Sequence, residues 1–153
     1  MEVIVALLAA FIALLAWKSQ RTHNRLSVTP FPSLGLSSYN DRLGIVLANN
    51  GIGPMRVLKL RFVKNDGTSF ESAQSVVSTR NADFITSADG TALAPNKRIA
   101  VLKVKGIPEE RGTDMHLTRV ELSEFKIVVE YTDVYGTSFP PYSKDLKWFT
   151  EHG

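Results

Sequence analysis

Residues 43–63 read LGIVLANNGIGPMRVLKLRFV and form the clearest strand, turn and strand pattern in the chain. The first six of these residues are continuously apolar, which is typical of a buried central strand. The last eight alternate, so we expect Leu58, Leu60 and Phe62 to face a core and the cations between them to face water. Short strands separated by turn residues are the pattern of an all-β sandwich or barrel.

The loop inside this stretch is the densest turn signal in the sequence. Asparagine and glycine tolerate positive φ, and proline ends a loop by fixing its own φ. The glycines lack the spacing of a Walker A or dinucleotide-binding loop, and a strand rather than a helix is expected after them. We therefore interpret the loop as structural, with the turn residues Asn50, Gly51, Gly53 and Pro54.

Turn residues divide the rest of the domain into short segments as well. The strands expected in total are 26–31 at a sheet edge, 43–48, 56–63, 68–70, 99–104, 126–131 and 137–139. Residues 71–90 fit either a short helix or a long surface connection, and residues 117–125 fit either a helix or a strand. Residues 106–114 are expected to form a loop.

The number of strands and the lack of βαβ alternation together predict the fold class. We expect an all-β, immunoglobulin-like two-sheet sandwich over residues 26–153. Asp133 and Gly136 are expected to form a structural turn, with the Asp133 carboxylate hydrogen-bonded to the turn backbone. The chain has no cysteine, which excludes a disulfide framework, a thiolate metal site and a cysteine nucleophile.

The N-terminal residues 1–17 are predicted to form a transmembrane helix. Val3 to Trp17 contains no charged side chain, and a helix of this length rises about 22 Å, against a hydrocarbon core of about 30 Å. Two other interpretations are a cleaved signal peptide and a buried core helix, although the segment has neither a basic n-region nor a polar face. The predicted membrane-facing residues are Val3, Leu7, Phe11, Leu14 and Trp17.

Residues 18–25 are predicted to be a basic juxtamembrane linker. Lys18, Arg21 and Arg25 follow the span, whereas only Glu2 precedes it, so the positive-inside rule places the C-terminal domain in the cytoplasm. The remaining residues, 26–153, hold 15 basic and 14 acidic side chains and are almost neutral. We therefore expect a membrane protein with a single span and a cytoplasmic C-terminal domain, and no nucleic-acid partner is expected.

Three pieces of the sequence carry a resemblance to a known group. These pieces are His23–Pro30 (HNRLSVTP), Asn49–Pro54 (NNGIGP) and Tyr131–Gly136 (YTDVYG). The chain resembles a group of small, uncharacterised bacterial proteins that have one N-terminal span and a compact β domain. The resemblance implies this architecture and a location in the bacterial inner membrane, and it implies no catalytic residues.

Residues capable of chemistry are few and scattered. His23, His116 and His152 lack the spacing of a zinc site, and no nucleophile elbow is present. Glu109-Glu110 and Asp114 are interpreted as solvated loop residues. We expect no catalytic residues, no metal site and no cofactor.

One charged feature remains, which is a possible basic patch. If two strands pair, four cations would share one face: Lys59, Arg61, Lys103 and Lys105. We expect a non-enzymatic, membrane-anchored protein-interaction module whose partners are the lipid bilayer and another protein. The alternative is a tethered β domain that senses a ligand, nucleotide or lipid headgroup through this patch. A periplasmic assembly or adhesion module and a hydrolase are two further alternatives, and the sequence gives no indication of the oligomeric state.

Overall fold

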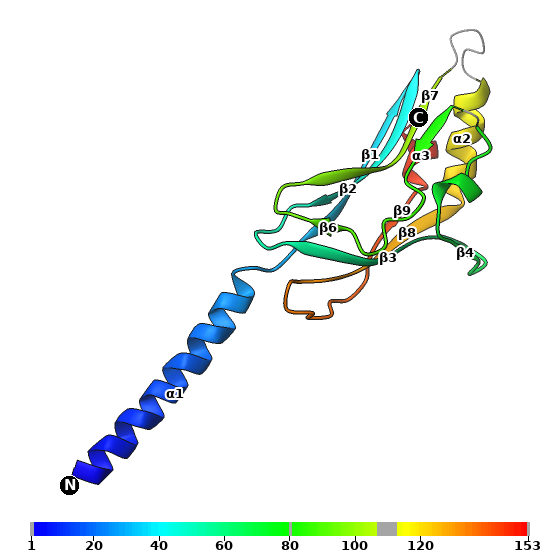
Figure 1. The fold of residues 1–153 in the computed structure, drawn as a ribbon. Helices are drawn as coiled ribbons and strands as arrows, with labels where there is room; N and C mark the ends of the chain where they lie inside the picture. Colours follow the sequence, from blue (N-terminus) through cyan, green and yellow to red (C-terminus); the bar gives the residue numbers. More distant parts are fainter. Residues whose placement is uncertain (1, 80, 107–112, 153) are drawn as a thin grey trace.

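The computed structural model describes residues 2–79, 81–106 and 113–152. Within these ranges a long N-terminal helix, α1, precedes a domain built of two antiparallel β-sheets. Figure 1 shows α1 projecting from one end of this domain, where the chain enters it. We call this the helix-proximal end.

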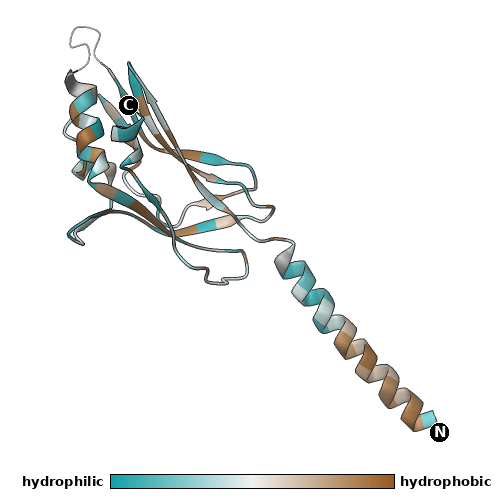
Figure 2. Ribbon diagram, turned by 180° about the vertical axis from the view of Figure 1, so that it is seen from behind, coloured by the Kyte–Doolittle hydropathy of each residue, from teal (hydrophilic) through white to brown (hydrophobic). Residues whose placement is uncertain are grey.

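Helix α1 runs from Glu2 to Leu26 and is long and apolar enough to cross a membrane. The candidate span, Glu2–Arg25, has 24 residues, and none of its apolar window is buried against the domain. Figure 2 shows the hydrophobic part of α1 away from the domain and the hydrophilic part next to it. An apolar helix without protein cover suits membrane anchoring.

The predicted linker is not a separate segment, because residues 18–25 form the last turns of α1. No helix-breaking residue occurs before Pro30, which can neither donate a backbone hydrogen bond nor allow helical geometry at Thr29. The helix ends just before this point, where the Ser27 hydroxyl donates a hydrogen bond to the carbonyl oxygen of Asn24 at 2.9 Å. The first strand begins only six residues after the helix ends, at Pro32.

The two sheets have different strands but the same antiparallel pairing. The first sheet has the order β1-β2-β7-β5, formed by Pro32–Tyr39, Arg42–Asn49, Arg98–Lys105 and Ala82–Phe84. The second sheet has the order β4-β3-β8-β9, formed by Ser69–Phe70, Met55–Lys64, Phe125–Thr132 and Tyr142–Asp145. The short strand β6, Ala92–Leu93, also pairs with β3.

Most of the predicted strands are confirmed, and two are not. Residues 26–31 end α1 and continue as a turn and an irregular segment that hydrogen-bonds to the β2–β3 loop, so the predicted edge strand is wrong. Residues 137–139 contribute only an isolated bridge, between Ser138 and Thr132. The first edge strand lies later in the chain, as β1.

The two ambiguous stretches are now assigned. Residues 71–90 contain a short 3₁₀ helix, Ala73–Ser75, and the strand β5. Residues 117–125 are helical up to Ser123, as part of α2 (Thr113–Ser123), and β8 starts at Phe125. A last short helix, α3, covers Trp148–Glu151.

Strand β3 contains a β-bulge that shifts its alternation by one residue. The register with β8 changes between Val57 and Lys59. As a result Val57 and Leu60 both face the core, and Leu58 is 41% exposed. The prediction that Leu58 shares the core face is therefore wrong, whereas Leu60 and Phe62 are buried as expected.

The core lies between the two sheets and is closed at the far end by α2 and α3. The first sheet contributes alternate residues of β2, and the second contributes β3 and β8. The largest fully buried side chains are Phe62, Phe149, Leu34, Ile45, Leu47, Met55, Leu102, Leu122, Ile127 and Leu146. Burial of these side chains supplies most of the stability of such a domain.

Candidate functional site at the helix–domain junction

The candidate functional site is the junction between α1 and the β domain. The chain leaves α1 at Leu26 and passes through residues 27–31 before entering β1. The β2–β3 loop, residues 50–54, lies against this short passage, and the β8–β9 turn that begins at Asp133 lies against the last turn of α1.

Asn49 is the centre of the junction. Its side chain is fully buried at the end of β2, on the same inward face as Ile45 and Leu47. The amide oxygen accepts hydrogen bonds from the backbone N–H of Phe31 at 3.1 Å and of Gly51 at 3.0 Å. The amide nitrogen donates to two backbone carbonyls, those of Gly53 at 2.8 Å and Leu93 at 3.0 Å.

This set of bonds uses the whole hydrogen-bonding capacity of the side chain, since a primary amide has two acceptor sites and two donors. Backbone bonds add to it, because the N–H of Asn50 donates to Phe31 O at 2.8 Å and that of Gly53 to Thr29 O at 3.4 Å. The passage out of α1 is thereby fixed to the β2–β3 loop and, through Asn49, to β6.

The glycines of the loop are required for close approach rather than for backbone freedom. Gly51 and Gly53 are both buried, and neither belongs to the described residues with positive φ. A Cβ atom on Gly53 would overlap the carbonyl group of Val28, and one on Gly51 would overlap the backbone of Thr29 and Phe31. The loop is structural, as predicted, but the reason is steric.

The second loop forms the turn predicted at Asp133 and Gly136. The Asp133 carboxylate accepts hydrogen bonds from the backbone N–H of Tyr135 and of Thr137, both at 2.8 Å. Gly136 has φ of 75°, a conformation that favours glycine. Burial opposes ionisation of Asp133, but the bonds from Thr137 and Tyr135 and the charge of Arg25 outweigh it and lower its pKa.

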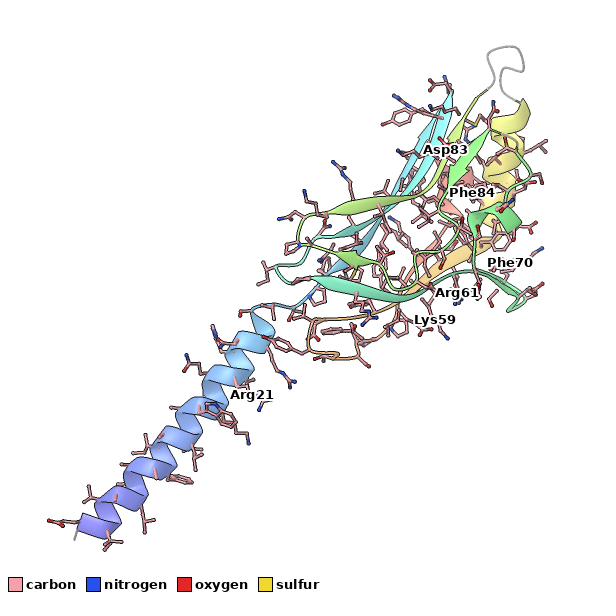
Figure 3. All side chains as sticks on the ribbon, in the orientation of Figure 1. Arg21, Lys59, Arg61, Phe70, Asp83 and Phe84 are labelled. Atoms are coloured by element: carbon pink, nitrogen blue, oxygen red, sulfur yellow. The ribbon has the colours of Figure 1, made fainter. Side chains whose placement is uncertain are left out.

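A cavity of about 280 Å³ lies between α1 and this turn. The Arg21 guanidinium lies 5.5 Å from the centroid of the Trp17 ring, and the Arg25 guanidinium lies 5.6 Å from that of the Tyr135 ring. Figure 3 shows Arg21 on the part of α1 next to the domain. The lining residues are Trp17, Gln20, Arg21, Asn24, Arg25 and Tyr135.

Large apolar side chains are exposed on the loops of the helix-proximal end. Ile52 is 68% exposed at the tip of the β2–β3 loop, and Val134 is 60% exposed in the Asp133 turn. Phe31 and Tyr135 are also more than half exposed. These side chains lie on the end of the domain from which the apolar helix extends.

The predicted basic patch does not form. Lys59 and Arg61 lie on β3, and Lys103 and Lys105 lie on β7, in the other sheet, so the two strands do not pair. In Figure 3, Lys59 and Arg61 are well separated from Asp83, which lies opposite Lys103 on β5. The expectation of a shared basic face is therefore wrong.

Arg61 is in addition neutralised by acidic partners. Its guanidinium makes hydrogen bonds of 3.0–3.2 Å with the Asp89 carboxylate and lies 3.3 Å from Glu71. Asp89 also accepts the backbone N–H of Leu60 at 3.0 Å, next to the bulge. Burial of Asp89 opposes its ionisation, but the bonds from Arg61 and Leu60 outweigh it and lower its pKa.

The remaining candidates for chemistry do not converge. His23 is on α1, His116 is exposed on α2, and the His152 ring contacts Trp148. Over the described ranges, no group of three or more His, Cys, Asp or Glu residues could hold a metal ion. Glu109-Glu110 lies outside the described residues. Asp114 belongs to the first turn of α2, so the prediction that the loop extends to residue 114 is wrong.

Sequence reasoning selected Asn50 in this loop and missed Asn49. Asn50 is exposed, and only its backbone contributes to the junction. The signal for Asn49 was present in the alternation of β2, because it continues the inward series Leu43, Ile45 and Leu47. A polar side chain at an inward position must have buried partners.

Comparison with known proteins does not assign the chain to a family. No protein-family model matches the sequence, and no curated protein matches it.

Proposed function

We propose that the protein is a single-pass membrane-anchored module that holds its β domain at the bilayer to bind another protein, as a scaffold or accessory subunit. The observation that carries this proposal is the Asn49 network. It couples the exit of an apolar helix directly to the core of the domain. A flexible tether would restrict only the location of the domain, whereas this rigid junction also restricts its orientation relative to the helix.

A fixed orientation is useful to a protein that presents a surface to a partner in the same membrane. Restricting the domain reduces the rotational freedom that is lost on association, so a weak interface can suffice. We propose the bacterial inner membrane as the location, with the domain in the cytoplasm, because the cations lie on the domain side of the span. The group of small single-span bacterial proteins described above is the proposed family.

We also propose that the domain is immunoglobulin-like. The strand order supports this, since β1-β2-β7-β5 and β3-β8-β9 correspond in chain order to the two sheets of a constant-type immunoglobulin domain. Strand β4 is then an additional edge strand beside β3. Such domains bind other proteins through loops and sheet faces without any catalytic group.

The alternative function, a ligand sensor that uses the basic patch, loses its geometric basis because the four cations lie in two sheets. It is not the function that we favour.

The proposal is tested with full-length protein extracted from membranes in a mild detergent after chemical crosslinking in cells. We expect one co-purifying protein in stoichiometric amount, identified by mass spectrometry. The matched variant carries a flexible Gly-Ser insertion of six residues between Ser27 and Val28. The insertion keeps the membrane anchor but uncouples the orientation of the domain from that of α1. We expect this variant to lose most of the crosslinked partner while staying in the membrane fraction.

Two results would overturn the proposal. Recovery of the full-length protein alone would contradict binding to a partner protein. Equal crosslinking by the insertion variant would contradict a role for the rigid junction between α1 and the domain. Reporter fusions at the two ends of the chain test the orientation separately. Replacement of Lys18, Arg21 and Arg25 by glutamate should invert it.

A further inference from the structure

The depth of the junction in a bilayer follows from the length of the apolar segment. Val3–Trp17 rises about 22 Å, which is about 8 Å less than the hydrocarbon thickness. This mismatch draws the residues after Trp17 toward the hydrocarbon. Arg21 lies about 6 Å and Arg25 about 12 Å beyond Trp17 along the helix, so both fall within or next to the headgroup layer.

The cavity at this depth is lined by hydrogen-bond donors. Two guanidinium groups, two side-chain amides and a phenol face it, and none of its described lining residues is acidic. Asp133 lies near Arg25 and balances part of its charge, but the carboxylate is already hydrogen-bonded within its own turn. The site therefore keeps a net positive charge.

The two arginines are arranged for binding an anion. Each guanidinium lies over an aromatic ring, which restrains it and leaves its N–H edges open. Among the described residues, neither guanidinium donates a hydrogen bond to the protein. A planar guanidinium with free edges matches the oxygen atoms of a phosphate group.

We propose that this cavity binds the phosphate of an anionic phospholipid from the surrounding bilayer. The inference rests on the membrane anchoring in the proposed function but not on the protein partner. Arg21 and Arg25 would contact the phosphate, and Asn24 and Gln20 would contact the polar headgroup. The cavity is slightly smaller than the usual range of small-molecule sites, about 300–1,000 Å³, which suits a headgroup rather than a whole lipid.

The apolar rim of the helix-proximal end supports a lipid rather than a free anion. Val134 and Tyr135 are exposed beside the cavity, and Ile52 and Phe31 are exposed on the same end of the domain. In the headgroup layer these side chains would contact the upper part of the acyl chains. A soluble phosphate ion would gain nothing from them.

The test uses full-length protein in detergent micelles, with retained lipid counted by native mass spectrometry. The probes are phosphatidylglycerol, phosphatidylcholine and inorganic phosphate. We expect one phosphatidylglycerol to be retained at least fivefold more than phosphatidylcholine. Arg25→Gln should reduce this retention about tenfold, Arg25→Lys less, and the matched control Lys18→Gln less than twofold.

The control removes one charge from the same end of α1 but not from the lining of the cavity. Equal losses in Lys18→Gln and Arg25→Gln would overturn the proposal, because attraction to the basic helix end would then be general. Displacement of phosphatidylglycerol by millimolar inorganic phosphate would show that the cavity binds a free anion, and would contradict a lipid as the source of the phosphate group. An unchanged thermal unfolding midpoint shows that a variant is folded, and Arg21→Gln serves as the second variant.

Discussion

Asn49 and Asp89 both form hydrogen bonds with backbone groups at places where regular strand pairing stops, but one is a neutral amide and the other a carboxylate. Asn49 joins the exit of α1, the β2–β3 loop and β6 through four hydrogen bonds to backbone groups, and it is fully buried. Asp89 covers the free edge of β3 at its bulge, and its side chain is 31% exposed.

The difference follows from what each group can satisfy. A primary amide both donates and accepts, so it can pair with N–H and C=O groups at once without burying a charge. An ionised carboxylate only accepts hydrogen bonds, so it cannot pair with carbonyl groups, and burial of its charge is costly unless N–H donors or a cation compensate it. Asn49 therefore suits the interior of the junction, and Asp89 suits the sheet edge, where Arg61 is available.

The largest effect is expected for Asn49→Ala. The substitution leaves the N–H groups of Phe31 and Gly51 and the carbonyls of Gly53 and Leu93 without partners in a buried place. We expect a loss of about 4 kcal/mol in the free energy of unfolding, since each unsatisfied buried group costs about 1–3 kcal/mol. Chemical unfolding of full-length protein in micelles, followed by circular dichroism, measures it.

The adjacent Asn50 provides the control. Its side chain is exposed and only its backbone N–H bonds to Phe31, so Asn50→Ala should change the free energy of unfolding by less than about 0.5 kcal/mol. Similar effects of the two substitutions would show that the Asn49 side chain does not hold the junction together.

The next largest effect is expected for Gly53→Ala. The added methyl group overlaps the backbone of Val28, which cannot rotate away as a side chain could. We expect a loss of about 3 kcal/mol in the free energy of unfolding, at the upper end for overpacking. Gly35→Ala is the control, because its Cβ would make only ordinary contacts, 3.9–4.0 Å from atoms of Val46. An equal loss at both positions would contradict the close approach of the helix exit to the loop.

Much of the fold can be predicted from the sequence. A continuous apolar run predicts β2, and alternation predicts β3 and β8. Strand β7 is also predicted, although it buries the consecutive residues Val101 and Leu102. The apolar helix is equally plain, because a run of uncharged residues needs no tertiary information. The turn at Asp133 was predicted with its hydrogen bonds, since an Asx turn is a local structure.

What the sequence did not show depends on contacts between distant segments. The bulge that exposes Leu58 follows from the register with β8. The basic patch required β3 and β7 to pair, and the order of strands in a sheet is not encoded in local patterns. Gly53 was recognised as a turn residue, but its actual role is set by Val28, which is 25 residues earlier in the chain.

A smaller effect, and one that depends on pH, is expected for Asp89→Asn. The amide keeps an acceptor for Leu60 but loses the charge that pairs with Arg61, so we expect a loss of about 1 kcal/mol at neutral pH. Because folding lowers the pKa of Asp89, its stabilisation is present above the ordinary carboxyl pKa and is lost as pH falls through the folded value.

Unfolding measured from pH 7 down to pH 2 tests whether Asp89 stabilises the fold as a carboxylate. The wild type should lose stability below about pH 4, where unfolded aspartate begins to bind protons, and Asp89→Asn should lose less. Asp133 also has a lowered pKa, so part of the acid dependence will persist in this variant. An identical acid dependence in the variant and the wild type would show that Asp89 is not stabilised as a carboxylate in the fold.

The smallest effect is expected from coupling between Lys59 and Lys103. Each is exposed and has an acidic cross-strand neighbour, Glu130 for Lys59 and Asp83 for Lys103, in a different sheet. Lys59→Gln and Lys103→Gln should each change the free energy of unfolding by less than about 0.5 kcal/mol, and the double variant should equal their sum within about 0.5 kcal/mol. Cations that share one face repel each other, so removing either one would relieve the same repulsion, and the double variant would show a gain smaller than the sum of the two single variants. Such a gain would place the two strands side by side and contradict the separation of the basic residues between the sheets.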